Sequence, residues 1–288
     1  MTEKKQQWRI IDVLNWSKNY LDEKGVESPQ IEVEWIMRDV LNCSRLDLYM
    51  DHEKPLANKE LKQIRSYLKK RVDGRPIQYV LGYTEFYGRK FEVDDSVLIP
   101  RPETEIIIEK IIEKCKDREN LKILDIGTGS GNIIVTLVKE LDNAGGLGLD
   151  ISKKALEVAR KNSKLNETEQ NIDFLEMDIL SDCPANRLFD IIVSNPPYIS
   201  EEMYQKLPGY IKDHEPEEAL KPGQDPLVFY KRINEIVNYL LKDNGLLALE
   251  IGGTYQEKKA KRVFEDNFDQ IEVIHDYLGQ SRGLLIYP

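Results

Sequence analysis

The residues with the clearest capacity for chemistry lie in segment 194–200, SNPPYIS, directly after the apolar run LFDIIV. Proline fixes φ and lacks a backbone N–H group, so Pro196 and Pro197 cannot continue a strand inside a sheet. The segment should therefore leave the strand as a rigid, extended chain that carries Asn195 and Tyr198. Because ligands of open α/β sheets bind at the carboxyl ends of the strands, this segment is a candidate ligand site.

Two oxygen atoms of this segment suit a transfer reaction to nitrogen. Amide and exocyclic amino nitrogens are poor nucleophiles because their lone pair is delocalised. The side-chain oxygen of Asn195 and the carbonyl of Pro196 can accept the N–H groups of such a nitrogen and stabilise positive charge as it develops. Tyr198 can pack its ring on the planar acceptor group. Most of the acceleration would come from orientation and desolvation rather than from a strong base.

A glycine-rich turn follows an expected strand in LKILDIGTGSGNIIV. Gly127, Gly129 and Gly131 permit a tight turn and a close approach of the backbone to a ligand. Rossmann dehydrogenases use a related pattern, so the glycines alone do not define the ligand. Asp125 adds information, because a carboxylate inside the turn repels a pyrophosphate but suits an α-amino group. The turn is also not followed by a P-loop lysine.

Two further carboxylates follow the next two expected strands. Asp150 closes GLGLD, where a carboxylate can accept hydrogen bonds from both hydroxyls of a ribose. Asp178 follows LEM and can accept from an adenine amino group, while the backbone of Ile179 faces the ring. Each acid alone is commonly a turn or helix cap. Three acids after three successive strands, behind a glycine turn, predict a nucleoside with an amine and no phosphate, which is S-adenosylmethionine.

The strands that position these residues alternate with helices from about residue 121 onward. Strands separated by single helices form a parallel, doubly wound sheet. Only GQSR separates the last two strands, which predicts an antiparallel hairpin at the end. We therefore predict an α/β, Rossmann-like, seven-stranded sheet with helices on both faces. Its strands are expected at 121–127, 145–151, 171–177, 189–195, 245–252, 271–278 and 283–288.

The chain before the sheet divides into two parts. Residues 1–74 have helical periodicity and predict a small helical bundle. Residues 75–95 are aromatic and β-branched, with two glycines as breaks, and predict a β-hairpin joint to a sheet domain over 96–288.

Local signals in the helical part are specific. Ser28 and Pro29 should begin one helix, and Gly25 should follow the end of another. Trp8, Trp16 and Trp35 are expected in the core, because large aromatic side chains dominate small cores. An exposed tryptophan would instead indicate a docking face.

Composition limits the class of partner. The formal net charge is −10 at pH 7, and basic residues are mixed with acids. A protein that grips nucleic acid through phosphates has a basic footprint, so we expect no direct nucleic-acid partner. No run approaches membrane-spanning length, and Cys43, Cys115 and Cys183 lack Cys-x-x-Cys spacing. We expect a cytoplasmic protein that uses no metal and does not bind a membrane.

Several motifs give the chain a family resemblance: RPIQYVLGYTEFYG, VLIPRPETE, DIGTGSGNI, SNPPYIS, HEPEEAL and LEIGGTYQ. Asn-Pro-Pro-Tyr alone is typical of methyltransferases that act on planar nitrogens, including DNA adenine enzymes. The combined set resembles the protein-(glutamine-N5) methyltransferases that modify peptide-chain release factors. The resemblance covers nearly the whole chain and is weakest over residues 1–70.

The resemblance implies an enzyme and a substrate. The enzyme would transfer a methyl group from S-adenosylmethionine to the side-chain nitrogen of the glutamine in the Gly-Gly-Gln motif of a release factor, leaving S-adenosylhomocysteine. The sheet would be a methyltransferase sheet, and the bundle over 1–74 would help to dock the release factor. A large protein substrate leads us to expect a monomer.

The resemblance also implies site residues. Arg101, Glu103 and Thr104 would lie at the mouth of the donor pocket, although Arg101 can equally form a salt bridge at the start of a helix near Glu105. The glutamine would be held by Asn195, Pro196, Pro197 and Tyr198. With the two acids argued above, the predicted donor site comprises Asp125, Gly127, Thr128, Gly129, Ser130, Gly131, Asp150, Asp178, Ile179 and Asn195.

Two alternatives and two departures accompany this interpretation. A nucleic-acid adenine methyltransferase would share the chemistry of Asn-Pro-Pro-Tyr, but acidic charge and the lack of a basic recognition domain disfavour it. A binding module without turnover is disfavoured by the intact motif. The chain has KPGQDPL, with Pro222 and Pro226, where the family commonly has Gly-Gly-x-Asp-Gly, and GQSRG where Gly-x-Asp-Arg is common. These departures concern the loop over the site and an outlying salt bridge.

Overall fold

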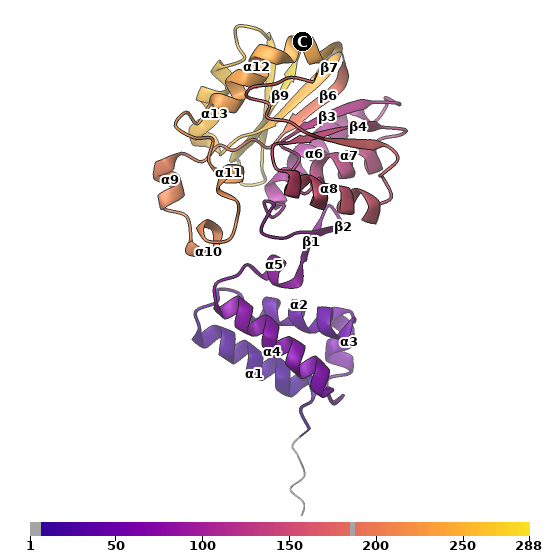
Figure 1. The fold of residues 1–288 in the computed structure, drawn as a ribbon, viewed down its shortest axis with the longest axis vertical. Helices are drawn as coiled ribbons and strands as arrows, with labels where there is room; N and C mark the ends of the chain where they lie inside the picture. The colour runs from indigo at the N-terminus through magenta and orange to yellow at the C-terminus, as the bar shows by residue number, and fades with distance from the viewer. Residues whose placement is uncertain (1–6, 185–187) are drawn as a thin grey trace, which may run out of the picture. The chain divides into compact units, whose positions relative to one another are not determined.

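The computed structural model describes residues 7–184 and 188–288, and the chain divides into two compact units (Figure 1). The first unit ends at Gly82 and the second begins at Tyr83. This division falls inside the predicted joint over 75–95, so the joint contributes to both units.

The first unit is a bundle of helices around an aliphatic core. Ser28 and Pro29 begin the second helix as predicted, and Gly25 follows the first with a φ of 77°, a left-handed conformation that suits glycine. The helical bundle is confirmed. Its helices are α1 (Ile10–Glu23), α2 (Pro29–Leu41), α3 (Arg45–Met50), α4 (Asn58–Val72) and α5 (Ile77–Leu81).

The prediction that the tryptophans fill this core is wrong for two of them. Trp16 is 46% exposed and Trp35 is 38% exposed, while Trp8 is half-buried. Trp16 stacks on Tyr20 with ring centroids 5.2 Å apart and meets Trp8 edge-on. The core between the helices is aliphatic, and Trp8, Trp16 and Tyr20 pack against one another beside it.

The joint is only partly the predicted hairpin. β1 (Tyr83–Phe86) and β2 (Arg89–Glu92) pair antiparallel, and the two residues between them, Tyr87 and Gly88, both have positive φ, as in a tight two-residue turn. The preceding residues form the short helix α5, which ends at Gly82 with a φ of 81°. A left-handed glycine therefore ends a helical turn here rather than breaking a strand.

The second unit is built on a seven-stranded sheet in the order β5-β4-β3-β6-β7-β9-β8. Strands β3 to β7 are parallel, and β9 runs antiparallel to both of its neighbours. The Rossmann-like sheet and its final hairpin are confirmed. The strands are β3 (Lys122–Ile126), β4 (Gly145–Asp150), β5 (Ile172–Glu176), β6 (Phe189–Ser194), β7 (Leu241–Glu250), β8 (Gln270–His275) and β9 (Ser281–Tyr287).

Helices cover both faces of this sheet. Alternate residues of one strand face opposite layers, so Ile123 packs with α6 (Pro102–Cys115) and α7 (Asn132–Glu140), and Leu124 packs with α12 (Val228–Leu240) and α13 (Thr254–Arg262) (Figure 1). Burial on both faces explains why the strands are continuous apolar runs. Helix α6 begins at Pro102, earlier than the predicted start near Glu105. The other helices are α8 (Lys153–Leu165), α9 (Glu201–Gln205), α10 (Gly209–Lys212) and α11 (Glu217–Leu220).

The strand order reverses between β3 and β6. The chain leaves β3 for β4 on one side, and β6 returns to pair with β3 on the other. The carboxyl ends of β3 and β6 therefore border a crevice, the usual ligand position in such sheets. Over residues 7–184 and 188–288, no helix combines the length and the apolar character needed to cross a bilayer.

Candidate active site

A cavity of about 380 Å³ lies at the carboxyl ends of β3, β4 and β6. Most of the residues singled out from the sequence meet in its wall, although they come from several different loops. Those that line it are Arg101, Thr104, Gly127, Thr128, Gly129, Ser130, Asp150, Asp178, Ile179, Asn195, Pro196 and Pro197.

A second cavity of about 200 Å³ adjoins the first. Tyr198 lines only this smaller cavity, together with apolar residues such as Leu207 and Ile211. Asn195 and Pro196 line both cavities. The start of the Asn-Pro-Pro-Tyr motif therefore forms a wall shared by a larger and a smaller compartment.

The glycine turn forms the floor of the larger cavity. Gly127 and Gly129 have φ values of 72° and 53°, which side chains of other residues rarely adopt. The Asp150 carboxylate accepts the backbone N–H of Gly129 at 2.9 Å and that of Ser152 at 2.8 Å, so this acid fixes the turn. Gly131 does not line the cavity; its φ of 78° and the 3.2 Å that would separate an added Cβ from that of Ala159 both favour glycine there.

Asp125 takes a different place from the one predicted. Its carboxylate is fully buried, accepts the Thr128 hydroxyl at 2.6 Å, and does not line either described cavity. Burial raises the pKa of Asp125 to about 7, against the opposing effect of the Thr128 hydrogen bond. Asp125 thus supports the turn from behind the wall that Thr128 presents.

The predicted adenine contacts are arranged as a capped turn. Asp178 accepts the backbone N–H of Leu180 at 2.9 Å, the capping role that single acids often have. The Ile179 carbonyl accepts a hydrogen bond from Arg232 at 2.9 Å. Both Asp178 and Ile179 nevertheless line the larger cavity.

The segment after β6 is anchored to the neighbouring strand. The Ser194 hydroxyl donates to the Ile126 carbonyl at 2.7 Å, which joins the ends of β6 and β3. Beyond it, the Tyr198 hydroxyl donates to Glu250 at 3.3 Å. The motif is therefore held at its first strand end and at its tyrosine, with Asn195 and Pro196 between them.

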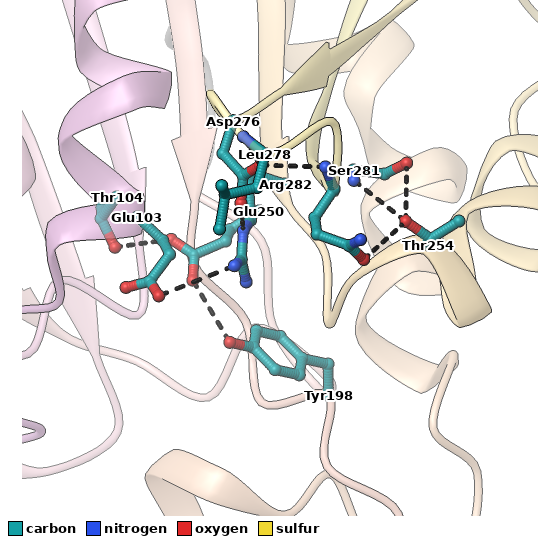
Figure 2. Close-up of polar contacts among 10 residues, drawn as sticks. Glu103, Thr104, Tyr198, Glu250, Thr254, Asp276, Leu278, Ser281 and Arg282 are labelled. Carbon is teal, nitrogen blue, oxygen red and sulfur yellow. Dashed lines mark hydrogen bonds and ion pairs between the residues drawn. The ribbon is translucent and has the colours of Figure 1, made fainter.

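The predicted mouth residues have separate environments, and Figure 2 shows two of them, Glu103 and Thr104. Thr104 lines the larger cavity and donates its hydroxyl to Glu250 at 2.6 Å. Arg101 lines both cavities and is also ion-paired with the buried Glu215, so both interpretations of Arg101 hold geometrically. Glu103 lines neither cavity and lies 3.8 Å from Arg282. The structure therefore does not place Glu103 at the mouth of the donor pocket, as had been predicted.

The two departures from the family pattern are accommodated. Pro222 lines the larger cavity beside Gly223, and the Pro226 carbonyl accepts a long hydrogen bond from Gln256 at 3.4 Å. In GQSRG, Arg282 still makes an ion pair, with Asp276 at 2.8 Å.

Glu250 is the main residue that reasoning from the sequence missed. It is the last residue of β7, and its buried carboxylate accepts from both Thr104 and Tyr198. Burial raises its pKa to about 7. The sequence signal that could have found Glu250 is the one that identified Asp150: an acid at the end of an apolar strand, here in LEIGG.

The donor set fits a nucleoside without phosphates. Arg101 and Lys221 are cations in the wall of the larger cavity, and each is neutralised: Arg101 by Glu215, and Lys221 by Glu201 and Glu217 at 2.7 Å each. A phosphate would require uncompensated donors. The Asp150 oxygens each retain a lone pair beyond their backbone bonds, which suits ribose hydroxyls. When bound, S-adenosylmethionine would supply an electrophilic methyl group to this site.

The buried acids predict an unusual pH dependence of stability. The pKa values of Asp125 and Glu250 are about 7, against ordinary values of 3.8 and 4.5, so the folded chain keeps protons that the unfolded chain releases. The free energy of unfolding should therefore fall as pH rises from about 4 to about 7, by up to about 4 kcal/mol for Asp125 and about 3 kcal/mol for Glu250. Urea titrations at several pH values in this range should show that the free energy of unfolding depends less steeply on pH in Asp125→Asn than in the wild type. An unchanged dependence of the free energy of unfolding on pH would contradict the raised pKa of Asp125.

Comparison with known proteins defines first the class and then the family. A methyltransferase domain model matches residues 117–273. The fold resembles the catalytic domain of hMettl16 in complex with a MAT2A 3′UTR hairpin (TM-score 0.59, 14% identity, 94% of this chain and 91% of that chain) and a methyltransferase from Pyrococcus furiosus (TM-score 0.52, 16% identity, 81% and 98%). The second unit is a methyltransferase fold.

Sequence relatives identify the family. The PrmC N-terminal domain model matches residues 12–82. Release factor glutamine methyltransferases from Fusobacterium nucleatum, Chlorobaculum tepidum and Bacillus subtilis are 37%, 36% and 37% identical to the chain. The alignments cover 96% of this chain in each case and 78%, 96% and 96% of the relatives. The chain belongs to the release factor glutamine methyltransferase family.

Proposed function

We infer that the protein transfers a methyl group from S-adenosylmethionine to the side-chain amide nitrogen of a release-factor glutamine, the one in the Gly-Gly-Gln motif. The observation that carries this function is the wall shared by the two cavities. It places Asn195 and Pro196 between a compartment suited to a nucleoside and a smaller one lined by Tyr198.

The chain's own residues orient the reacting amide. The Asn195 side-chain oxygen and the Pro196 carbonyl accept the two N–H groups of the glutamine, which turns the nitrogen lone pair toward the larger cavity. The same oxygens stabilise the positive charge that develops on nitrogen, and this charge is removed when the methylated amide releases one proton to solvent. Tyr198 packs against the amide plane and excludes water. Asp150 and the glycine turn hold the donor, so that both reactants keep a fixed orientation.

The first unit would dock the release factor. Two of its tryptophans, Trp16 and Trp35, are exposed in place of the predicted burial, and exposed aromatic side chains are typical anchors of protein interfaces. Together with the acidic net charge, this favours a protein partner over a nucleic acid. We propose that the reaction takes place in the cytoplasm.

Methyl transfer can be tested directly. Labelled S-adenosylmethionine should label a purified release factor, and should not label the same factor after its Gly-Gly-Gln glutamine is changed to alanine. DNA should remain unlabelled. Label on DNA but not on the release factor would assign the site to nucleic acid, and label on the alanine variant would place the reaction on another residue.

A further inference from the structure

The ring of Tyr198 lies in a seat built by the end of β7. Glu250 accepts the Tyr198 hydroxyl on one side (Figure 2). Two residues later, Gly252 makes room for the ring: a Cβ added there would lie 2.9 Å from Tyr198 Cδ2 and 2.3 Å from the Tyr255 hydroxyl. One short segment, LEIGG, therefore fixes the hydroxyl and accommodates the edge of the same ring.

Burial of the Glu250 side chain lowers the stability of the fold unless its interactions compensate for the loss of hydration. Glu250 is 3% exposed, and within the described ranges its side chain forms no ion pair, only the two hydrogen bonds from Thr104 and Tyr198. Burying an acid without a cation beside it is costly, and an apolar residue could fill the same volume, so packing alone does not explain an acid at this position. Buried acids with few partners next to a cavity are typical of functional sites.

The two partners of Glu250 lie on different compartments. Thr104 lines the larger cavity and Tyr198 lines the smaller one. Glu250 itself lines neither described cavity, so it has no direct route to a ligand. Any effect on the reaction must pass through the side chains that it holds.

We propose that Glu250 is a positioning residue for methyl transfer, which holds the Tyr198 ring against the acceptor amide by accepting its hydroxyl. The role rests on the proposed function of the site. Without this bond the ring can rotate or withdraw, and the amide loses the surface that orients its nitrogen. Rates of oriented reactions are sensitive to such displacements, whereas the affinity for the donor depends on the other cavity.

Variants of the pair give the first test. Glu250→Met keeps length but removes the acceptors of both Tyr198 and Thr104, and should lower kcat for the release factor about tenfold. Glu250→Gln should restore most of the rate, since its amide can accept from Tyr198 while donating to Thr104. Tyr198→Phe removes only the Tyr198 bond and leaves Thr104 held, so it should lower kcat to a similar extent with the donor Kd unchanged. The double variant should be no slower than Glu250→Met, because that substitution already removes the Tyr198 bond.

A structural role would give a different pattern. Tyr230→Phe is the matched control, because the buried Tyr230 hydroxyl donates at 2.8 Å to the backbone carbonyl of Glu250 rather than to its side chain. It should lower Tm but leave kcat unchanged. Should Glu250→Met fail to fold, Gly252→Ala tests the seat from the ring side, with Glu250 intact, and should lower kcat with the donor Kd unchanged.

The outcomes separate this inference from the function it rests on. Multiplying effects in the double variant, or full activity in a folded Glu250→Met or Gly252→Ala protein, would overturn the positioning role while wild-type methylation of the release factor stands. A wild-type protein that binds the donor but never labels the release factor would overturn the proposed function, and the positioning role with it.

Discussion

Replacing Asn195 by alanine should slow methyl transfer to the release factor by about two orders of magnitude or more, while the donor binds almost as before. Asn195 lines both cavities, and its oxygen is one of two acceptors proposed for the glutamine N–H groups. The acceptor amide would lose one of its two fixed partners in the transition state. The donor site would lose only one of many wall residues.

Single-turnover rates and calorimetry would separate these two effects. Asn166→Ala is a suitable control, because Asn166 belongs to the same unit and lines neither described cavity. Its turnover should match that of the wild type. If Asn195→Ala also turns over normally, Asn195 has no part in the mechanism.

The sequence predicted the sheet and its binding edge well, because both follow from chain order. Alternating strands and helices allow few topologies, and parallel strands bring their carboxyl ends to one edge. Asp150 and Asn195, at the ends of β4 and β6, therefore meet at one cavity despite their distance in sequence.

The burial and the direction of individual side chains were harder to predict than the edge of the sheet at which they lie. Asp125 precedes the last residue of β3, and the pleat turns its side chain inward, where it is fully buried. In α6, successive residues differ by about 100° around the helix axis, so Thr104 reaches the cavity and Glu103 does not. Motif membership carries no information about either effect.

Residues that act through others leave a weak signal in the sequence. Glu250 reaches Thr104 and Tyr198 over separations of 146 and 52 residues, and both contacts exist only after the sheet has formed. The tryptophans of the first unit illustrate the same limit. Helical periodicity predicted the bundle, but the exposed flank of α1, where Trp16 lies, depends on how the helices pack.

Replacing Asp150 by alanine should weaken the binding of S-adenosylmethionine by about 1–3 kcal/mol, the usual cost of losing charge-assisted hydrogen bonds. The ribose hydroxyls would lose the carboxylate to which we propose that they donate. The backbone N–H groups of Gly129 and Ser152 would lose the same acceptor, which now fixes the glycine turn. Both effects act on the donor compartment, so Kd should rise and the rate at saturating donor should change less.

Calorimetry against a matched turn variant would isolate the ribose contribution. Asp276 also accepts two backbone N–H groups with one carboxylate, those of Leu278 and Gln280 at 2.9 Å each, but it lines neither described cavity. Asp276→Ala should therefore lower stability without changing the donor Kd. If Asp150→Ala behaves in the same way, this acid only braces the glycine turn, and the ribose must be held by other residues of the wall.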